Sequence, residues 1–257
     1  MDEDVDVFVE HRADTMVVTL ANPSARNAQS PATWRRLAQA RDDIRPETRF
    51  ILLTGQGPSF SAGLDRRMLT PEGVPGEESL WSLVGRGDKA VEDMITAAQS
   101  AFTWWGEVPQ VTIALVQGHA IGAGFQLALA ADLLVAAPDA LFAMRETSLG
   151  LVPDLGGTGP LVDRVGYARA LEICATGRYV DAEEAHRIGL ANAVVDIEEW
   201  GQYLDQLCAP IRAALPGAVG DVKALLRGAT SDSAQLTRER EAQKRRLREL
   251  SALLGGA

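Results

Sequence analysis

The chain has 257 residues, of which 46% are hydrophobic, and it carries a formal net charge of −10. This length and apolar content are enough for a large buried core, while the acidic balance argues against nucleic-acid binding, which needs a clustered basic surface. The acidic N-terminus, two cysteines in apolar helical surroundings and the lack of any run of about 18 apolar residues predict a cytoplasmic protein that does not bind membranes.

The first sixty residues predict a hairpin, a helix and a strand. Residues 5–10 and 16–20 are rich in β-branched side chains and flank a turn-like segment. Ser30 is typical of a helix N-cap, with Pro31 at the first helical position and apolar residues at helical spacing up to Ile44. The apolar run 50–54, which two glycines follow, predicts a short strand.

A tight loop at 59–65 precedes a segment that extends to about Gly87 and contains proline and glycine. This composition predicts an irregular, mobile segment of the kind that covers a pocket. From Asp88 to Trp105, apolar residues recur every three or four positions, which predicts one long helix.

Residues 111–158 combine apolar strands, three glycines and three polar side chains. Val111–Val116 and Leu133–Ala136 are almost entirely apolar and predict buried parallel strands, with a helix at 124–131 between them. Gly118, Gly122 and Gly124 remove side chains where a loop enters this helix. The loop at 62–63 also precedes a helical segment. If each of the two loops aims one backbone N–H group at the same point, the pair would stabilise an oxygen that becomes negative during a reaction. Small-residue loops of this kind also serve packing alone, and the residues by themselves leave both interpretations open.

Beyond Asp154 the pattern is mainly helical. Helices are predicted at 160–165, 167–176, 181–188, 198–209, 218–226 and 233–254, with a short strand at 193–195 and helix breaks at Pro210, Pro216 and Gly228. Because the alternation of strand and helix stops near residue 196, we expect an α/β core over 1–195 and a helical region over 196–257.

Three ordered segments then resemble a known family. Residues 59–65 (SFSAGLD), 118–124 (GHAIGAG) and 150–158 (GLVPDLGGT) are similar to signature segments of the enoyl-CoA hydratase/isomerase (crotonase) superfamily, and the resemblance extends from about Val7 to Leu226. It implies an α/β fold of spiralling β-β-α turns with a C-terminal helical trimerisation region. It also implies an acyl-CoA thioester substrate, assembly as a homotrimer or a dimer of trimers, and no separate cofactor, since coenzyme A is part of the substrate. The residues themselves predict no metal site, because no spacing of His, Cys, Asp and Glu is typical of one.

The resemblance implies roles for single residues as well. The backbone N–H groups of Ala62 and Ala123 correspond to the oxyanion hole of the family. Five further residues fall on positions near coenzyme A: Arg26, Ala28, Ser61, Asp65 and Lys223.

The acid/base positions differ from those of hydratases. Hydratases of the family carry two glutamates, which fall here on Gln126 and Glu146. An amide does not transfer a proton, whereas isomerases of the family use one carboxylate at the Glu146 position. Asp154 resembles an aspartate of dienoyl-CoA isomerases, which gives a second candidate acid/base. We therefore expect double-bond isomerisation of an enoyl- or dienoyl-CoA, with hydration and non-catalytic acyl-CoA binding as the alternatives.

Each of these side chains also has a structural interpretation. Asp154 is typical of a turn before two glycines, Glu146 of a carboxylate bound by backbone, and Gln126 of an amide on a helix surface. Trp81, Trp104 and Trp105 are expected either in the core or along an acyl pocket.

Overall fold

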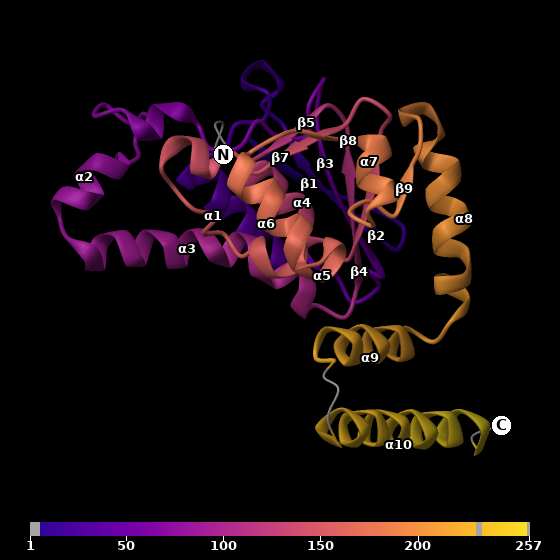
Figure 1. Cartoon of the computed structure of the whole chain (residues 1–257). Helices are drawn as coiled ribbons and strands as arrows, with labels where there is room; N and C mark the ends of the chain where they lie inside the picture. Colours follow the sequence, from indigo (N-terminus) through magenta and orange to yellow (C-terminus); the bar gives the residue numbers. More distant parts are fainter. Residues whose placement is uncertain (1–5, 230–232, 256–257) are drawn as a thin grey trace.

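The strands of the chain form two sheets that helices cover (Figure 1). A computed structural model describes residues 6–229 and 233–255. Val5, the first residue of the predicted hairpin, lies outside the described residues. The remainder of that hairpin is confirmed, with a turn at Ala13.

Strands and helices are interspersed up to residue 194, and the elements described beyond it are helices. The strands are β1 (Val7–Arg12), β2 (Thr15–Leu20), β3 (Phe50–Gly55), β4 (Val111–Val116), β5 (His119–Ile121), β6 (Leu133–Ala136), β7 (Leu141–Ala143), β8 (Val180–Asp181) and β9 (Ala193–Val194). The α-helices are α1 (Pro31–Gln39), α2 (Leu80–Gly85), α3 (Asp88–Glu107), α4 (Ala123–Ala130), α5 (Thr158–Val165), α6 (Tyr167–Thr176), α7 (Ala182–Arg187), α8 (Trp200–Ala213), α9 (Pro216–Arg227) and α10 (Ser233–Gly255). The 3-10 helices are η1 (Pro23–Ala25), η2 (Ala40–Asp43), η3 (Arg66–Leu69), η4 (Glu146–Leu149) and η5 (Ile197–Glu199).

The larger sheet has the strand order β1-β2-β3-β4-β6-β9. Only β1 and β2 pair antiparallel, and the other neighbours are parallel. The smaller sheet, β5-β7-β8, pairs β5 with β7 in parallel and β7 with β8 antiparallel. Because β4 leads into β5 and β6 leads towards β7, the chain repeatedly passes from the first sheet to the second.

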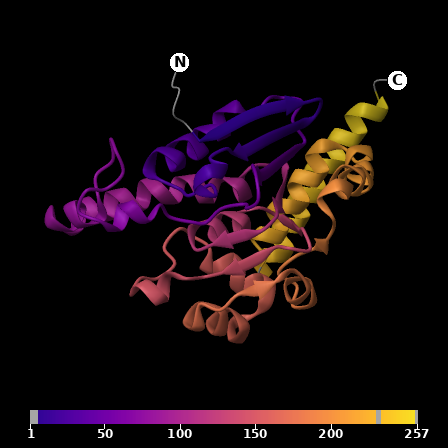
Figure 2. The ribbon, with the colours of Figure 1, turned by 90° about the horizontal axis from the view of Figure 1, so that it is seen from above.

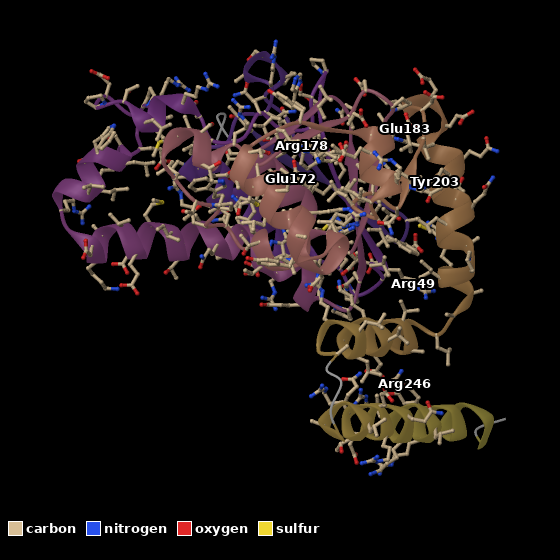
Figure 3. The ribbon with its side chains drawn as sticks, viewed as in Figure 1. Arg49, Glu172, Arg178, Glu183, Tyr203 and Arg246 are labelled. Carbon is tan, nitrogen blue, oxygen red and sulfur yellow. The ribbon has the colours of Figure 1, made fainter. Side chains whose placement is uncertain are left out.

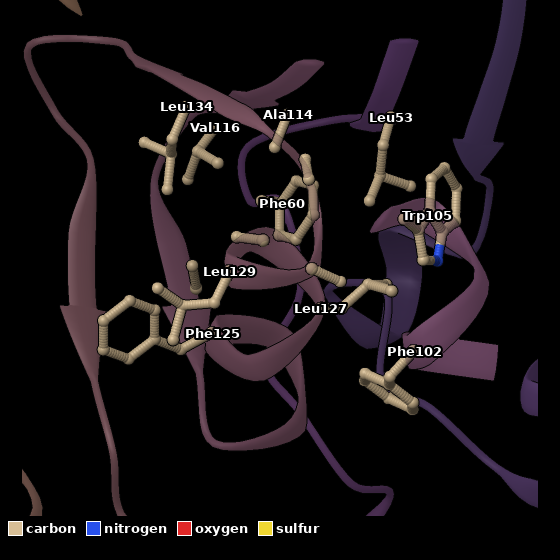
Figure 4. Packing of buried hydrophobic residues seen from close by; sticks show 14 of the residues in the cluster. Leu53, Phe60, Phe102, Trp105, Ala114, Val116, Phe125, Leu127, Leu129 and Leu134 are labelled. Carbon is tan, nitrogen blue, oxygen red and sulfur yellow. The ribbon is translucent and has the colours of Figure 1, made fainter. Parts of the chain in front are cut away.

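Both faces of the central strands are buried. In β4, Ala114 and Val116 belong to the main core, while Ile113 and Leu115 belong to a second cluster against α8. This alternation explains why the strand is almost entirely apolar, because successive side chains point to opposite faces and both faces are covered by protein. Figure 4 shows the main core, where Phe60 and Leu127 pack beneath the strands and Trp105 closes one side.

Two helical extensions leave the sheets on opposite sides (Figures 1 and 2). One consists of α2 and the N-terminal half of α3, and the other of α9 and α10. In the second extension Arg246 of α10 forms an ion pair with Asp221 of α9 at 2.7 Å, and its side chain lies between the two helices (Figure 3).

Several sequence-based boundaries differ from the structure, and two of the differences are large. The helix predicted to end before Pro210 continues to Ala213, because α8 packs on the sheet and Arg49 donates hydrogen bonds to the carbonyls of Ile211, Arg212 and Ala214 (Figure 3). Such tertiary contacts outweigh the one backbone hydrogen bond that a proline removes. The segment predicted to be irregular up to Gly87 contains η3 and α2, and the Trp81 indole donates to the Leu69 carbonyl at 2.7 Å.

A buried ion pair joins α9 to the sheet. The Lys223 ammonium lies 2.7 Å from Asp132 Oδ2 and donates to the carbonyls of Trp105 and Gln110 at 2.9 and 2.7 Å. The side chains of Lys223 and Asp132 are only 9% and 17% exposed, and burial lowers the pKa of Lys223. Removing one partner therefore leaves an uncompensated charge away from water.

We expect Asp132→Ala to lower the free energy of unfolding by about 3–5 kcal/mol, because it leaves the Lys223 ammonium without its counter-charge. Urea denaturation followed by circular dichroism measures the change. Lys223→Met in the Asp132→Ala background removes the stranded charge and should restore part of the loss. A single variant as stable as the natural protein contradicts this expectation.

Candidate active site

The segment 59–65 is held between two other stretches of backbone. On one side, Ser61 N–H donates to the His119 carbonyl at 2.8 Å and Ile121 N–H donates to the Ser61 carbonyl at 3.0 Å. On the other side, Gln29 N–H donates to the Gly63 carbonyl and Asp65 N–H to the Gln29 carbonyl, at 2.7 and 2.8 Å. The two glycine-bearing loops predicted to act together are therefore neighbours in space.

Their contact is close enough to exclude side chains. Gly63 has φ +86°, and a Cβ added there would lie 2.3 Å from the Ile121 carbonyl oxygen and 3.4 Å from the Ala123 nitrogen. Glycine is thus required at this position by both backbone conformation and space. The backbone that follows Gly63 lies beside the first turn of α4.

The hydrogen-bonding pattern corrects one predicted donor. Ala62 N–H donates to the Arg26 carbonyl at 2.8 Å, so this group is not available to a ligand. Within the part of the chain that the structure describes, the N–H groups of Leu64 and Ala123 have no acceptor. Ala123 begins α4, where helix N–H groups lack intrahelical partners. Sequence reasoning missed Leu64, since the free group is backbone and only the pairing of 59–65 reveals it.

The Glu146 carboxylate lies beside the same helix start. Gly122 has φ +52°, and a Cβ there would lie 3.4 Å from Glu146 Oε1 and 3.8 Å from Oε2. Glu146 begins η4, three positions after the end of β7 at Ala143, and its side chain is half-buried. The parallel pairing of β5 with β7 brings it there, because Gly122 N–H donates to the Ala143 carbonyl at 2.8 Å.

Gln126 connects Glu146 to the loop that carries Asp154. Its side chain is 1% exposed, which rules out the helix-surface interpretation. Its Nε2 donates to Glu146 Oε1 at 2.7 Å, and its Oε1 accepts from the N–H groups of Leu155 and Gly157 at 2.9 and 3.3 Å. Because two N–H donors face Oε1, the orientation of the amide is determined by its neighbours.

Burial raises the pKa of both carboxyl groups. For Glu146 the main cause is desolvation, to which the nearby charge of Asp154 adds, while hydrogen bonds from its own backbone and from Gln126 oppose the shift. For Asp154, which is half-buried, desolvation also dominates. Glu146 Oε2 is buried and has no hydrogen-bond partner among the described residues. A desolvated, unpaired carboxylate oxygen is a suitable proton acceptor.

Of the five residues predicted to contact coenzyme A, four lie close together in the structure and Lys223 lies elsewhere, on α9. Arg26, Ala28, Ser61 and Asp65 lie in the two paired segments around Gln29, and Arg26 is exposed. The Ser61 hydroxyl is fully buried, donates to the Asn27 carbonyl and accepts from Gln29. Asp65 forms an ion pair with Arg67 at 2.6 Å. The Lys223 ammonium is already occupied in this conformation by its ion pair and two carbonyl partners.

Other candidates divide between core and surface. Trp104 and Trp105 are buried in the main core, whereas Trp81 is 61% exposed. Over residues 6–229 and 233–255, no group of three potential ligands is placed to hold a metal ion. No helix in that same part of the chain is long and apolar enough to cross a membrane.

Comparison with known proteins finds the family that the sequence motifs predict. A family model described as enoyl-CoA hydratase/isomerase matches residues 10–252. A Mycobacterium tuberculosis protein assigned as an enoyl-CoA hydratase is 32% identical over 75% of this chain and 70% of its own length. A Salmonella typhi carnitinyl-CoA dehydratase is 34% identical, over 84% of this chain and 77% of its own.

Solved structures share the fold. A Thermobifida fusca protein assigned as an enoyl-CoA hydratase, crystallised with acetoacetyl-CoA, superposes with a TM-score of 0.89 at 38% identity, covering 95% of this chain and 96% of that one. The predicted crotonase-type α/β fold is thereby confirmed.

We expect Gln126→Glu to raise the pKa of Glu146 further. The new carboxylate still accepts from Leu155 and Gly157, but it replaces the donor to Glu146 with a second negative charge. An NMR titration of the carboxyl carbons, with Glu146→Gln used to assign the signal, measures the shift. A Glu146 midpoint at the same or a lower pH contradicts the contact between these two side chains.

Glu146→Gln should make the protein more stable at alkaline pH. Because folding raises the pKa of Glu146, the ionised form is disfavoured in the folded state, and stability is lost as pH rises through the folded-state pKa. The gain in thermal midpoint should therefore be present at pH 8 and vanish below the pKa of an unfolded glutamate. A gain that is independent of pH points to some other cause.

Proposed function

The chain belongs to the enoyl-CoA hydratase/isomerase family, and we propose that it shifts the double bond of an enoyl- or dienoyl-CoA. The relatives described above are all named for reactions of acyl-CoA thioesters, but their names do not favour isomerisation. The direction of the proposal towards isomerisation comes from the chain's own residues.

The proposed reaction uses two backbone donors and one base. The thioester oxygen accepts hydrogen bonds from the N–H groups of Leu64 and Ala123. Glu146 removes a proton from C2 of a 3-enoyl-CoA, and the electron pair moves through the thioester to give a dienolate. Asp154 gives a proton to C4, so that the double bond moves from C3–C4 to C2–C3. The N–H donors stabilise the oxygen where negative charge develops, which is where such groups accelerate a reaction most.

The observation that carries the proposal is the hydrogen bonding of Gln126. Its amide nitrogen is on Glu146 and its amide oxygen is on Leu155 and Gly157, so it orients the base and the neighbouring loop. An amide neither accepts nor gives a proton at neutral pH. Hydration requires one group to activate water and another to protonate the adjacent carbon. Of the two positions that hydratases of the family use, only Glu146 retains a titratable group.

Hydration is the second candidate, and one observation favours it. The relatives are assigned as hydratases or named a dehydratase, and Asp154 would then serve as the second proton-transfer group in place of Gln126. The third candidate is a protein that binds acyl-CoA at this site without catalysing a reaction. The three differ in their products, so a single set of substrates separates them.

The Thermobifida fusca complex with acetoacetyl-CoA supports an acyl-CoA thioester as the ligand. We propose that its thioester group lies between the two loops, beside the N–H groups of Leu64 and Ala123. We propose that Arg26, Ala28 and Asp65 lie along coenzyme A, because they flank the donor segment and Arg26 is free of any side-chain ion pair among the described residues. Assembly as a trimer or dimer of trimers is proposed for the helical extension of α9 and α10.

We expect the purified protein to convert 3-hexenoyl-CoA to 2-hexenoyl-CoA faster than it hydrates 2-hexenoyl-CoA. Glu146→Gln should lower the isomerisation rate by about 10²–10⁴, the usual contribution of a positioned proton-transfer group. Absorbance of the conjugated thioester and chromatography of the products provide the measurement.

The alternatives give other results. Faster hydration than isomerisation supports the second candidate, and binding of both thioesters without turnover supports the third. Either result overturns the isomerase proposal. Full activity in Glu146→Gln excludes Glu146 as the base.

A further inference from the structure

The Asp154 loop, defined as residues 153–157, is held from two sides. Gln126 of α4 accepts hydrogen bonds from Leu155 N–H and Gly157 N–H. From the opposite side, Gln99 Nε2 of α3 donates to the Asp154 carbonyl oxygen at 2.7 Å. These contacts come from helices that flank the loop, and Gln99 lies 55 positions before Asp154 in the sequence.

The two glutamines bond opposite ends of one peptide group. The Asp154 carbonyl and the Leu155 N–H belong to the same planar unit, so Gln99 and Gln126 together determine its orientation. A peptide plane held at both ends restricts ψ of Asp154. The direction of the Asp154 Cα–Cβ bond, and with it the side chain, is then restricted as well.

Gln99 reaches the loop from the wall of a cavity. The cavity has a volume of about 560 Å³ and lies between α2 and α3, with Val84, Val91 and Ile95 among its lining residues. One turn further along α3, Thr103 lies beside the same loop, since a Cβ on Gly156 would be 3.8 Å from its methyl carbon. The helix thus follows the loop over two turns, and Gln99 provides its polar contact.

We propose that Gln99 is a positioning residue, which aims the Asp154 carboxyl at the substrate carbon opposite Glu146 by holding the Asp154 carbonyl. This inference rests on the proposed isomerase function, in which Asp154 gives the second proton. Gln99 does not touch the reacting atoms and acts through Asp154. Loss of Gln99 should therefore slow the delivery of a proton to C4 by Asp154, while the removal of a proton from C2 by Glu146 should be unchanged.

Two measurements separate these steps. In D₂O, exchange of the C2 protons of 3-hexenoyl-CoA reports proton removal by Glu146, and formation of 2-hexenoyl-CoA reports delivery at C4. We expect Gln99→Glu and Gln99→Met to lower isomerisation about 10- to 100-fold, the range for a misplaced reacting group. We expect C2 exchange to stay within about threefold of the natural protein, because donor loops and base are intact.

A matched control shows that the effect is local. Gln110 Nε2 donates to the Thr48 carbonyl at 3.3 Å, which is the same kind of bond just beyond the far end of α3. Gln110→Glu should leave the ratio of exchange to isomerisation unchanged. The uncharged Gln99→Met variant excludes an effect of added charge, and urea denaturation confirms that each variant is folded.

A double-mutant cycle tests whether Gln99 acts through Asp154. In an Asp154→Asn background, Gln99→Met should cause no further loss of isomerisation. Equal loss of exchange and isomerisation in the Gln99 variants, or an additive cycle, overturns the inference while leaving the isomerase function in place. A natural protein that neither exchanges nor isomerises the thioester overturns the proposed function itself, and the inference with it.

Discussion

One buried amide joins the parts of the candidate site. Gln126 is almost inaccessible to water, and all of its strong contacts are with the base or with the backbone of the Asp154 loop. A buried amide of this kind is stable only when both its oxygen and its nitrogen are hydrogen-bonded. One set of hydrogen bonds, all made by the Gln126 amide, therefore connects Glu146 to the backbone of residues 155–157.

The donor side of the site depends on backbone rather than on side chains. Segment 59–65 pairs with 26–29 and with 119–121, and this pairing uses the N–H groups of Ser61, Ala62 and Asp65. The pairing leaves Leu64 beside the start of α4, and neither the Leu64 N–H nor the Ala123 N–H has an acceptor among the described residues. Since both donors are part of hydrogen-bonded backbone, little reorganisation is needed when charge develops on a bound oxygen.

Two sheets are needed to bring donors and base together. The parallel pairs β3 with β4 and β4 with β6 place the ends of successive strands at one edge, as is usual for ligand sites in parallel sheets. The short strands β5 and β7 pair with each other beyond that edge. Ala123 follows β5 and Glu146 follows β7, so the pairing brings these two residues close together. α3 completes the site from the outside, where Gln99 contacts the Asp154 carbonyl.

The sequence by itself determined the long elements and the identity of the polar groups. Apolar runs such as Val111–Val116 predicted buried strands, periodic residues predicted α3, and the motifs around 62, 123 and 154 predicted the family, because these signals are local in the chain. It did not determine the second sheet, whose strands are two or three residues long and too short to show periodicity. Only the tertiary structure decided that Ala62 N–H donates to the Arg26 carbonyl, that Leu64 N–H has no acceptor within residues 6–229 and 233–255, and that Gln126 faces Glu146. Hydrogen bonds between residues far apart in the chain choose which backbone group remains unpaired, and no local pattern of side chains encodes that choice.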